Sequence, residues 1–154
     1  GVEDTTYVAR TGAEAGIYIW NGSAYVLIAS VGSGVVVIPI GVAASDETSA
    51  LTTGAGKVSF RLPFSYTLTA VRANLVTAQA SGSIFTVDIN QNGTSILSTE
   101  ITIDNTQKTS TTATTPAVIL TSALTDDAEI TVDIDQIGNG SATGLKIWLI
   151  GSKT

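Results

Sequence analysis

The stretch from Asp88 to Gly93 reads D-I-N-Q-N-G and fits the opening of a calcium-loop signature, D-x-[DN]-x-[DN]-G. On this interpretation Asp88, Asn90 and Asn92 are the metal ligands. Calcium takes about six to eight oxygens, and such a loop supplies a bidentate Glu at its twelfth position, which is Thr99 here. The alternating polar and apolar residues instead favour a strand that ends in an Asn-Gly hairpin turn. We predict the hairpin and retain the three side chains as candidate calcium ligands.

A second pair of side chains, Asp133 and Asp135, could serve as the acid and base of a glycosidase. Glycosidase carboxyl groups stand about 5–9 Å apart, and residues two apart on one strand face have about that spacing. Solvated strand faces carry such pairs as well. The sequence contains no His and no Cys, so it lacks the commonest general base, a Cys nucleophile and the usual zinc and haem ligands. We predict a non-enzymatic protein without a cofactor.

Four aromatic residues, Tyr18, Trp20, Tyr25 and Trp148, could stack on sugar rings or pack against another subunit. Tyr18 and Trp20 fall on the same face of one expected strand, as a carbohydrate platform requires. A hairpin that is marginal by itself also needs a covering partner. Trp148 has apolar neighbours and is expected in a core or an interface. We favour the interface for all four residues and keep glycan stacking as the alternative.

The composition excludes several classes of partner. The 154-residue chain has 13 acidic and 7 basic residues and a net charge of −6, so we expect neither nucleic-acid binding nor attraction to anionic membranes. The longest apolar run, from Val35 to Ile40, is too short to span a bilayer, and no signal peptide opens the chain. Because the chain begins with Gly and contains no Met, we expect that its natural start is missing.

The elements that would position these residues are short strands. Only 13% of the residues are charged, and the abundance of Thr and Ser favours strands and turns over helices. Side chains are expected to alternate between two faces in residues 58–62, 67–75, 85–90, 95–103 and 130–134, and a further strand is expected over residues 145–150. No segment has the period of a long helix. The pattern predicts an all-β protein, an antiparallel β-sandwich of the jelly-roll type.

The chain is expected to divide at residue 34. Residues 1–34 contain two aromatic strands, 17–20 and 24–28, joined by Asn21-Gly22, and form an N-terminal hairpin that anchors the chain or makes a trimer. Residues 35–154 form the sandwich. Within it, the Thr-rich stretch from Thr106 to Pro116 has no predicted structure, and loops of that length are often mobile or functional.

Two parts of the sequence resemble bacteriophage proteins. The segment Y7-V-A-R-T-G-A-E-A-G-I-Y-I-W-N-G-S-A-Y-V26 resembles the short Gly–aromatic hairpin modules of phage fibre proteins. The body resembles a recurrent C-terminal β-domain of phage structural and fibre proteins, over residues 56–73, 83–90, 96–104, 128–135 and 144–151. The resemblance rests on pattern and brings no diagnostic site residues.

The resemblance implies a virion component with a jelly-roll-like domain at a fibre end or on the capsid. We therefore expect a homotrimer on the surface of an extracellular particle, attached to other virion proteins through residues 1–34 and available for host attachment. A host-surface glycan is a candidate partner, and head and tail positions stay open. The alternatives are a free-standing carbohydrate-binding module and a capsid cement protein.

Overall fold

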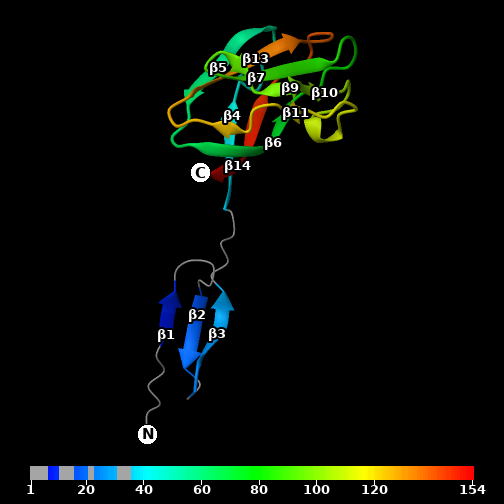
Figure 1. Ribbon diagram of the computed structural model, residues 1–154. Helices are drawn as coiled ribbons and strands as arrows, with labels where there is room; N and C mark the ends of the chain where they lie inside the picture. Colours follow the sequence, from blue (N-terminus) through cyan, green and yellow to red (C-terminus); the bar gives the residue numbers. More distant parts are fainter. Residues whose placement is uncertain (1–6, 11–15, 21–22, 31–35) are drawn as a thin grey trace. The chain divides into compact units, whose positions relative to one another are not determined.

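Figure 1 shows the protein as a computed structural model, which describes residues 7–10, 16–20, 23–30 and 36–154. The chain divides into two compact units, Gly1–Val35 and Val36–Thr154. The described residues are built from antiparallel strands and hold one short 3-10 helix, η1 (Ser110–Thr112). No helix in these ranges is long and apolar enough to cross a membrane. The predicted all-β class is confirmed.

The first unit contains one antiparallel sheet in the order β1-β2-β3. Its strands are β1 (Tyr7–Arg10), β2 (Gly16–Trp20) and β3 (Tyr25–Ser30). β2 and β3 are the two arms of the predicted hairpin, and Trp20 pairs with Tyr25 at its end. The expected turn residues Asn21 and Gly22 lie outside the described residues. β1, which adds a third strand, was not predicted from the sequence.

The second unit is an antiparallel sandwich of two main sheets, as predicted (Figure 1). One sheet has the order β10-β7-β13-β5, with β8 paired to β7, and the other has the order β12-β6-β14-β4. β9 and β11 form a separate pair. The strands are β4 (Val37–Ala43), β5 (Gly54–Arg61), β6 (Tyr66–Asn74), β7 (Phe85–Gln91), β8 (Thr94–Ser95), β9 (Leu97–Thr99), β10 (Ile101–Ile103), β11 (Val118–Ile119), β12 (Ala123–Leu124), β13 (Glu129–Gln136) and β14 (Lys146–Lys153).

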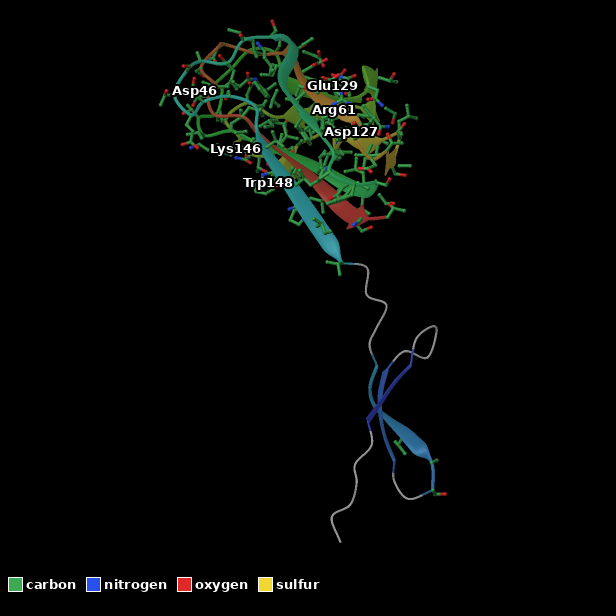
Figure 2. All side chains as sticks on the ribbon, turned by 90° about the vertical axis from the view of Figure 1, so that its left-hand side faces the viewer. Asp46, Arg61, Asp127, Glu129, Lys146 and Trp148 are labelled. Atoms are coloured by element: carbon green, nitrogen blue, oxygen red, sulfur yellow. The ribbon has the colours of Figure 1, made fainter. Side chains whose placement is uncertain are left out.

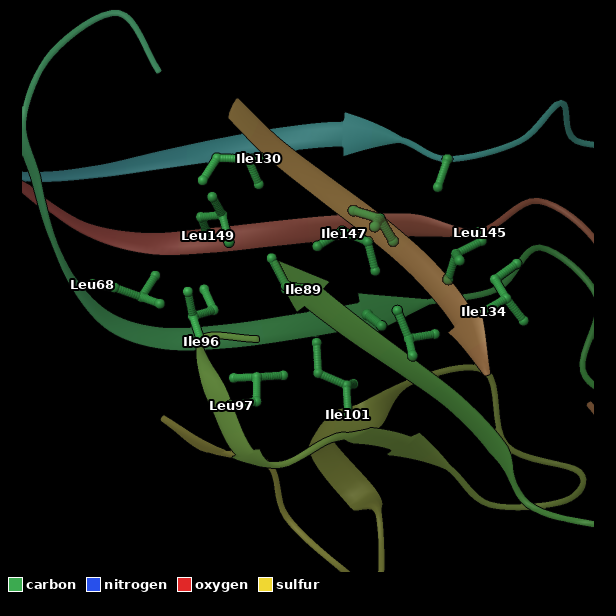
Figure 3. Packing of buried hydrophobic residues seen from close by; sticks show 14 of the residues in the cluster. Leu68, Ile89, Ile96, Leu97, Ile101, Ile130, Ile134, Leu145, Ile147 and Leu149 are labelled. Atoms are coloured by element: carbon green, nitrogen blue, oxygen red, sulfur yellow. The ribbon is translucent and has the colours of Figure 1, made fainter. Parts of the chain in front are cut away.

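The hydrophobic core lies between these two sheets. Figure 3 shows side chains from β7 and β13 meeting side chains from β6 and β14. The buried residues include Leu68, Phe85, Val87, Ile89, Ile130, Val132, Ile134, Ile147 and Leu149. Those on β7 and β13 occupy alternate positions, as the sequence predicts, and those on β14 alternate as well. Burial of each such side chain contributes roughly 1.5–3 kcal/mol to folding, which fixes the faces of these strands.

Strand β6 departs from the predicted alternation. An unbroken strand would place Leu68 and Ala73 on opposite faces, yet both are buried. The cause is a β-bulge at Thr69, where the register against β14 shifts, and the Thr69 hydroxyl donates a hydrogen bond to the Ile150 carbonyl at 3.0 Å. The extra residue reverses the face to which each later side chain of β6 points. Ala73 therefore points into the core, as Leu68 does.

The expected strand over residues 95–103 is broken into β8, β9 and β10. The breaks fall at Ile96 and Glu100, and the pieces pair with different neighbours. β8 and β10 pair with β7, whereas β9 pairs with β11. The predicted inward side chains of Leu97, Ile101 and Ile103 are nevertheless buried, because the apolar residues still face the core where the chain changes partner.

The Thr-rich loop of residues 106–116 is also more regular than expected. It contains η1, and its first part continues the sheet beside the end of β6. The Leu75 amide donates to the Lys108 carbonyl at 2.9 Å, and the Ala73 amide donates to the Ser110 hydroxyl at 2.9 Å. These bonds hold the first part of the loop against the edge of β6 and bring Thr109 and Thr111 beside Trp148 and Arg72.

Candidate functional site

The six residues of the calcium-like stretch form the end of β7 and a two-residue hairpin turn. Asn92 and Gly93 have φ values of 50° and 79°, the left-handed pair that a type I′ turn between antiparallel strands requires. Asp88 accepts a hydrogen bond from the Ser95 hydroxyl at 2.7 Å. The Asn92 side chain instead accepts from the Glu129 amide at 3.0 Å. The predicted hairpin is therefore present, and these oxygens have separate protein partners.

Asp133 lies on β13 directly opposite Asp88 on β7, so the two similar stretches of sequence are neighbouring strands. Its two oxygens accept hydrogen bonds from the Gly56 amide at 2.6 Å and the Asn90 side chain at 3.0 Å. Asn90 is 8% exposed, so it needs this partner. Asp133 therefore joins β5, β13 and β7, and its lone pairs are engaged in holding the sheet.

Asp135, the other member of the candidate glycosidase pair, sits at a β-bulge where the register against β7 shifts. Partial burial, and then the charges of Asp88 and Asp133, raise the pKa of its carboxyl group. Burial, and then Asp135 and Asp88, likewise raise the pKa of Glu100. In the described part of the chain, no three acidic residues are placed to hold a metal ion together. Asp88 and Asp133 therefore support the sheet through their hydrogen bonds, although the sequence of this carboxylate face (Asp88, Asp133 and Asp135) fits a metal site or a glycosidase pair.

The aromatic candidates divide between the two units. Tyr18, Trp20 and Tyr25 lie on β2 and β3, and their side chains are outside what the structure describes. Trp148 lies on β14 with 40% of its surface exposed, on the sheet surface beside β4 (Figure 2). The core alternative is therefore excluded for Trp148, and its place in a subunit interface stays a prediction. Its neighbours Ile147 and Leu149 face the core, and the alternation of the strand turns Trp148 outward.

The Trp148 indole is fixed on two sides. A β-carbon at position 41 would lie 2.6 Å from Cζ3 of the indole, so the six-membered ring can lie over β4 only because residue 41 is glycine. The indole Nε1–H donates a hydrogen bond to Oδ1 of Asn74 on β6, at 3.1 Å. The ring therefore spans the three neighbouring strands β4, β14 and β6 in a defined position.

The surface around Trp148 forms an open depression of about 390 Å³. Its polar lining comes from Arg72 and Asn74 of β6 and from Thr109 and Thr111 of the Thr-rich loop, and its apolar lining includes Pro39 and Ile150. Arg72 lies directly opposite Trp148 in the ladder. No carboxylate of the described residues lies within ion-pair distance of the Arg72 guanidinium. An aromatic face, a free cation and several hydroxyls thus converge here.

Sequence reasoning missed Gly41, Arg72 and Asn74 as members of this site. They come from strands far apart in the chain and meet only through the registers of β4 and β6 against β14. The Thr-rich composition of residues 106–116 was the one signal present, because it marked a loop that contributes Thr109 and Thr111.

Comparison of the chain with models of protein families, with curated proteins and with solved structures finds no significant match.

Proposed function

We propose that this chain is a non-enzymatic structural protein of a phage particle, which associates as a homotrimer through the unit of residues 1–35 and displays the sandwich for attachment to a host. The observation that carries the proposal is the small sheet of the first unit. Its strands read G-I-Y-I-W in β2 and Y-V-L-I-A-S in β3. Such consecutive apolar residues are unusual in a strand that faces water on one side.

Successive residues of a strand face opposite sides of the sheet. A strand with apolar residues at consecutive positions therefore carries them on both faces. The described residues of the first unit form one sheet of three short strands, which cannot cover two apolar faces by itself. Val26 of β3 is 43% exposed. Symmetric association of identical chains would provide the cover, because one apolar surface then covers another.

The second unit supports a display role. It has its own core between its two sheets, so it can fold without help from the first unit. Its outer surface is rich in hydroxyl groups and poor in charge, as the composition requires. Among the described residues only two ion pairs are present, Arg61–Asp127 and Lys146–Glu47. A surface of this kind suits an exposed assembly that makes polar contacts with another surface.

The test is the mass of the full chain in solution, measured by light scattering after gel filtration. We expect a trimer at micromolar concentration. Ile19→Asp in β2 should give a monomer whose sandwich remains folded, because a charge on an apolar interface opposes association. Thr53→Asp, which adds the same charge to an exposed position of the second unit, should leave the trimer intact. A full chain that is monodisperse and monomeric would refute self-association.

Location is tested separately by labelling intact particles with an antibody raised against residues 36–154. We expect label at one regular position on the particle surface, either on the head or at the fibre ends. Particles without label, under conditions in which the antibody binds the isolated protein, would refute the proposed place in the virion.

A further inference from the structure

We propose that the outer face of β4, β14 and β6 binds an acidic saccharide, with a pyranose ring stacked on Trp148 and a carboxylate paired with Arg72. The inference rests on the proposed display of the sandwich on a particle surface, because it names what that surface contacts. Trp148 and Arg72 lie side by side, because Trp148 of β14 pairs directly with Arg72 of β6. On its other side Trp148 pairs with Gly41 of β4.

Trp148 provides a surface on which a sugar can stack. One side of its six-membered ring is packed over Gly41, and 40% of the residue remains exposed. The face of an indole ring carries partial negative charge, and the axial C–H groups of a pyranose carry partial positive charge. The ring is already held by Asn74, so little side-chain freedom is lost when a ligand stacks on it.

Arg72 selects for negative charge. Of the residues that line the depression, none is acidic, although the whole chain has a net charge of −6. Arg72 has no carboxylate partner among the described residues and is available to a ligand. A guanidinium matches a carboxylate with two parallel hydrogen bonds. This pairing favours a uronic acid or another sugar acid over a neutral sugar.

The remaining polar groups suit hydroxyls. Asn74 uses its Oδ1 on Trp148, and its amide nitrogen carries two donors. Thr109 and Thr111 line the depression, and their two hydroxyls share one hydrogen bond of 3.0 Å. A second depression, of about 270 Å³, adjoins the first and shares Arg72 and Thr111 with it.

The probe is a trisaccharide of galacturonic acid, with the neutral trisaccharide of galactose as the matched control. Calorimetry with the full chain should give a Kd of about 1 mM or lower for the acidic ligand. The neutral ligand should bind about tenfold more weakly, because it lacks the charge-assisted pair with arginine. In ¹⁵N NMR spectra the acidic ligand should shift the indole N–H signal of Trp148.

Four variants separate this site from other parts of the surface. Trp148→Ala should abolish binding, and Arg72→Gln should lower the affinity for the acidic ligand about tenfold without changing the affinity for the neutral one. Arg61→Gln removes an arginine from the opposite sheet and should have no effect. Trp20→Ala removes the tryptophan of the first unit and should also have no effect. NMR spectra of each variant are the check that the sandwich is folded.

Gly41→Ala tests the position of the ring without removing it. The added methyl group would displace the indole, so we expect weaker binding and a changed indole N–H signal in a folded protein. Several results would overturn the inference: no binding of either trisaccharide, binding that survives Trp148→Ala, or equal affinity for the two ligands.

The same samples distinguish failure of the inference from failure of the proposed function. A trimeric chain on labelled particles that binds neither sugar would overturn the saccharide site alone. A chain that binds the acidic sugar but is a monomer and absent from particles would overturn the proposed function alone. If Trp148→Ala instead changes the oligomeric state, this face is covered by a second copy of the chain, and the saccharide site is refuted.

Discussion

The two outer faces of the sandwich use their side chains in opposite ways. On the face of β7 and β13, Asp88 and Asp133 are bound by a hydroxyl, an amide and a backbone N–H of the protein itself. On the face of β14 and β6, Trp148 is half exposed, and no carboxylate among the described residues pairs with Arg72. The first face is internally satisfied, whereas the second retains unused binding capacity.

This difference shows that residue types alone do not identify a site. The carboxylates of the first face match a metal signature and a glycosidase pair in sequence, yet Asp88 and Asp133 accept hydrogen bonds from the sheet itself. The apolar neighbours of Trp148 suggest a core position, yet alternation along β14 places the ring outside. Whether a polar or aromatic group can act on a ligand depends on whether the fold has already given it a partner.

The largest expected effect comes from Asp133→Ala, which tests whether the carboxylate face is structural. The substitution leaves the buried Asn90 amide and the Gly56 amide without their acceptor, so unfolding in urea should require about 2 kcal/mol less free energy. Binding of the trisaccharide should not change. Asp126→Ala, at an exposed turn, is the control and should alter stability little. An Asp133→Ala protein of normal stability would remove the distinction between the two faces.

A smaller effect is expected from Tyr66→Phe, which tests what holds β4 beneath Trp148. The buried Tyr66 hydroxyl donates to the Ile38 carbonyl of β4 and lies 3.2 Å from the Leu149 carbonyl. Its loss should cost about 1 kcal/mol of stability and speed the hydrogen exchange of β4 amides. Because Gly41 lies on the same strand, trisaccharide binding should weaken slightly. Unchanged exchange in β4 would show that the backbone ladder alone positions this face.

The parts of this fold that sequence predicts are those fixed by neighbouring residues. Alternation alone is enough to orient β7 and β13, and an Asn-Gly pair at residues 92–93 is enough to specify the turn. The Thr69 bulge depends on the register of β6 against β14, some 80 residues away in the chain. Nothing in the residues around Thr69 reveals that register.

The candidate site around Trp148, like the Thr69 bulge, depends on contacts between residues that are far apart in the chain. Trp148 was identified as a candidate because of its residue type, but its exposure and orientation depend on Gly41 and Asn74, which lie on other strands. The Thr-rich loop was expected to lack structure because it has no apolar alternation. It is ordered instead by hydrogen bonds from amides of β6 and Leu75 to the Ser110 hydroxyl and the Lys108 carbonyl, which are long-range contacts that composition does not encode.

The smallest effect concerns Asp135, where the carboxylate face carries an unfavourable charge. Partial burial and the charges of Asp88 and Asp133 raise the pKa of Asp135 in the folded state. At pH values above the folded pKa, ionised Asp135 therefore lowers the stability of the fold. This loss of stability disappears as the pH falls through the folded pKa to the unfolded pKa of about 3.9. Because the side chain is mostly exposed, Asp135→Asn should stabilise the protein by only a few tenths of a kcal/mol at neutral pH.

The pH dependence makes this prediction specific. The stability difference between Asp135→Asn and the original chain, measured by thermal unfolding, should be large at pH 7, shrink as the pH falls through the folded pKa, and vanish below the unfolded pKa of about 3.9. Asp126→Asn removes the same charge from an exposed turn and controls for the net charge of the chain. An Asp135→Asn protein that is less stable at pH 7 would mean that this carboxylate is held by a favourable contact. Repulsion between like charges would then not destabilise the face of β7 and β13 at Asp135. Only the hydrogen bonds of its carboxylates would distinguish this face from the one around Trp148.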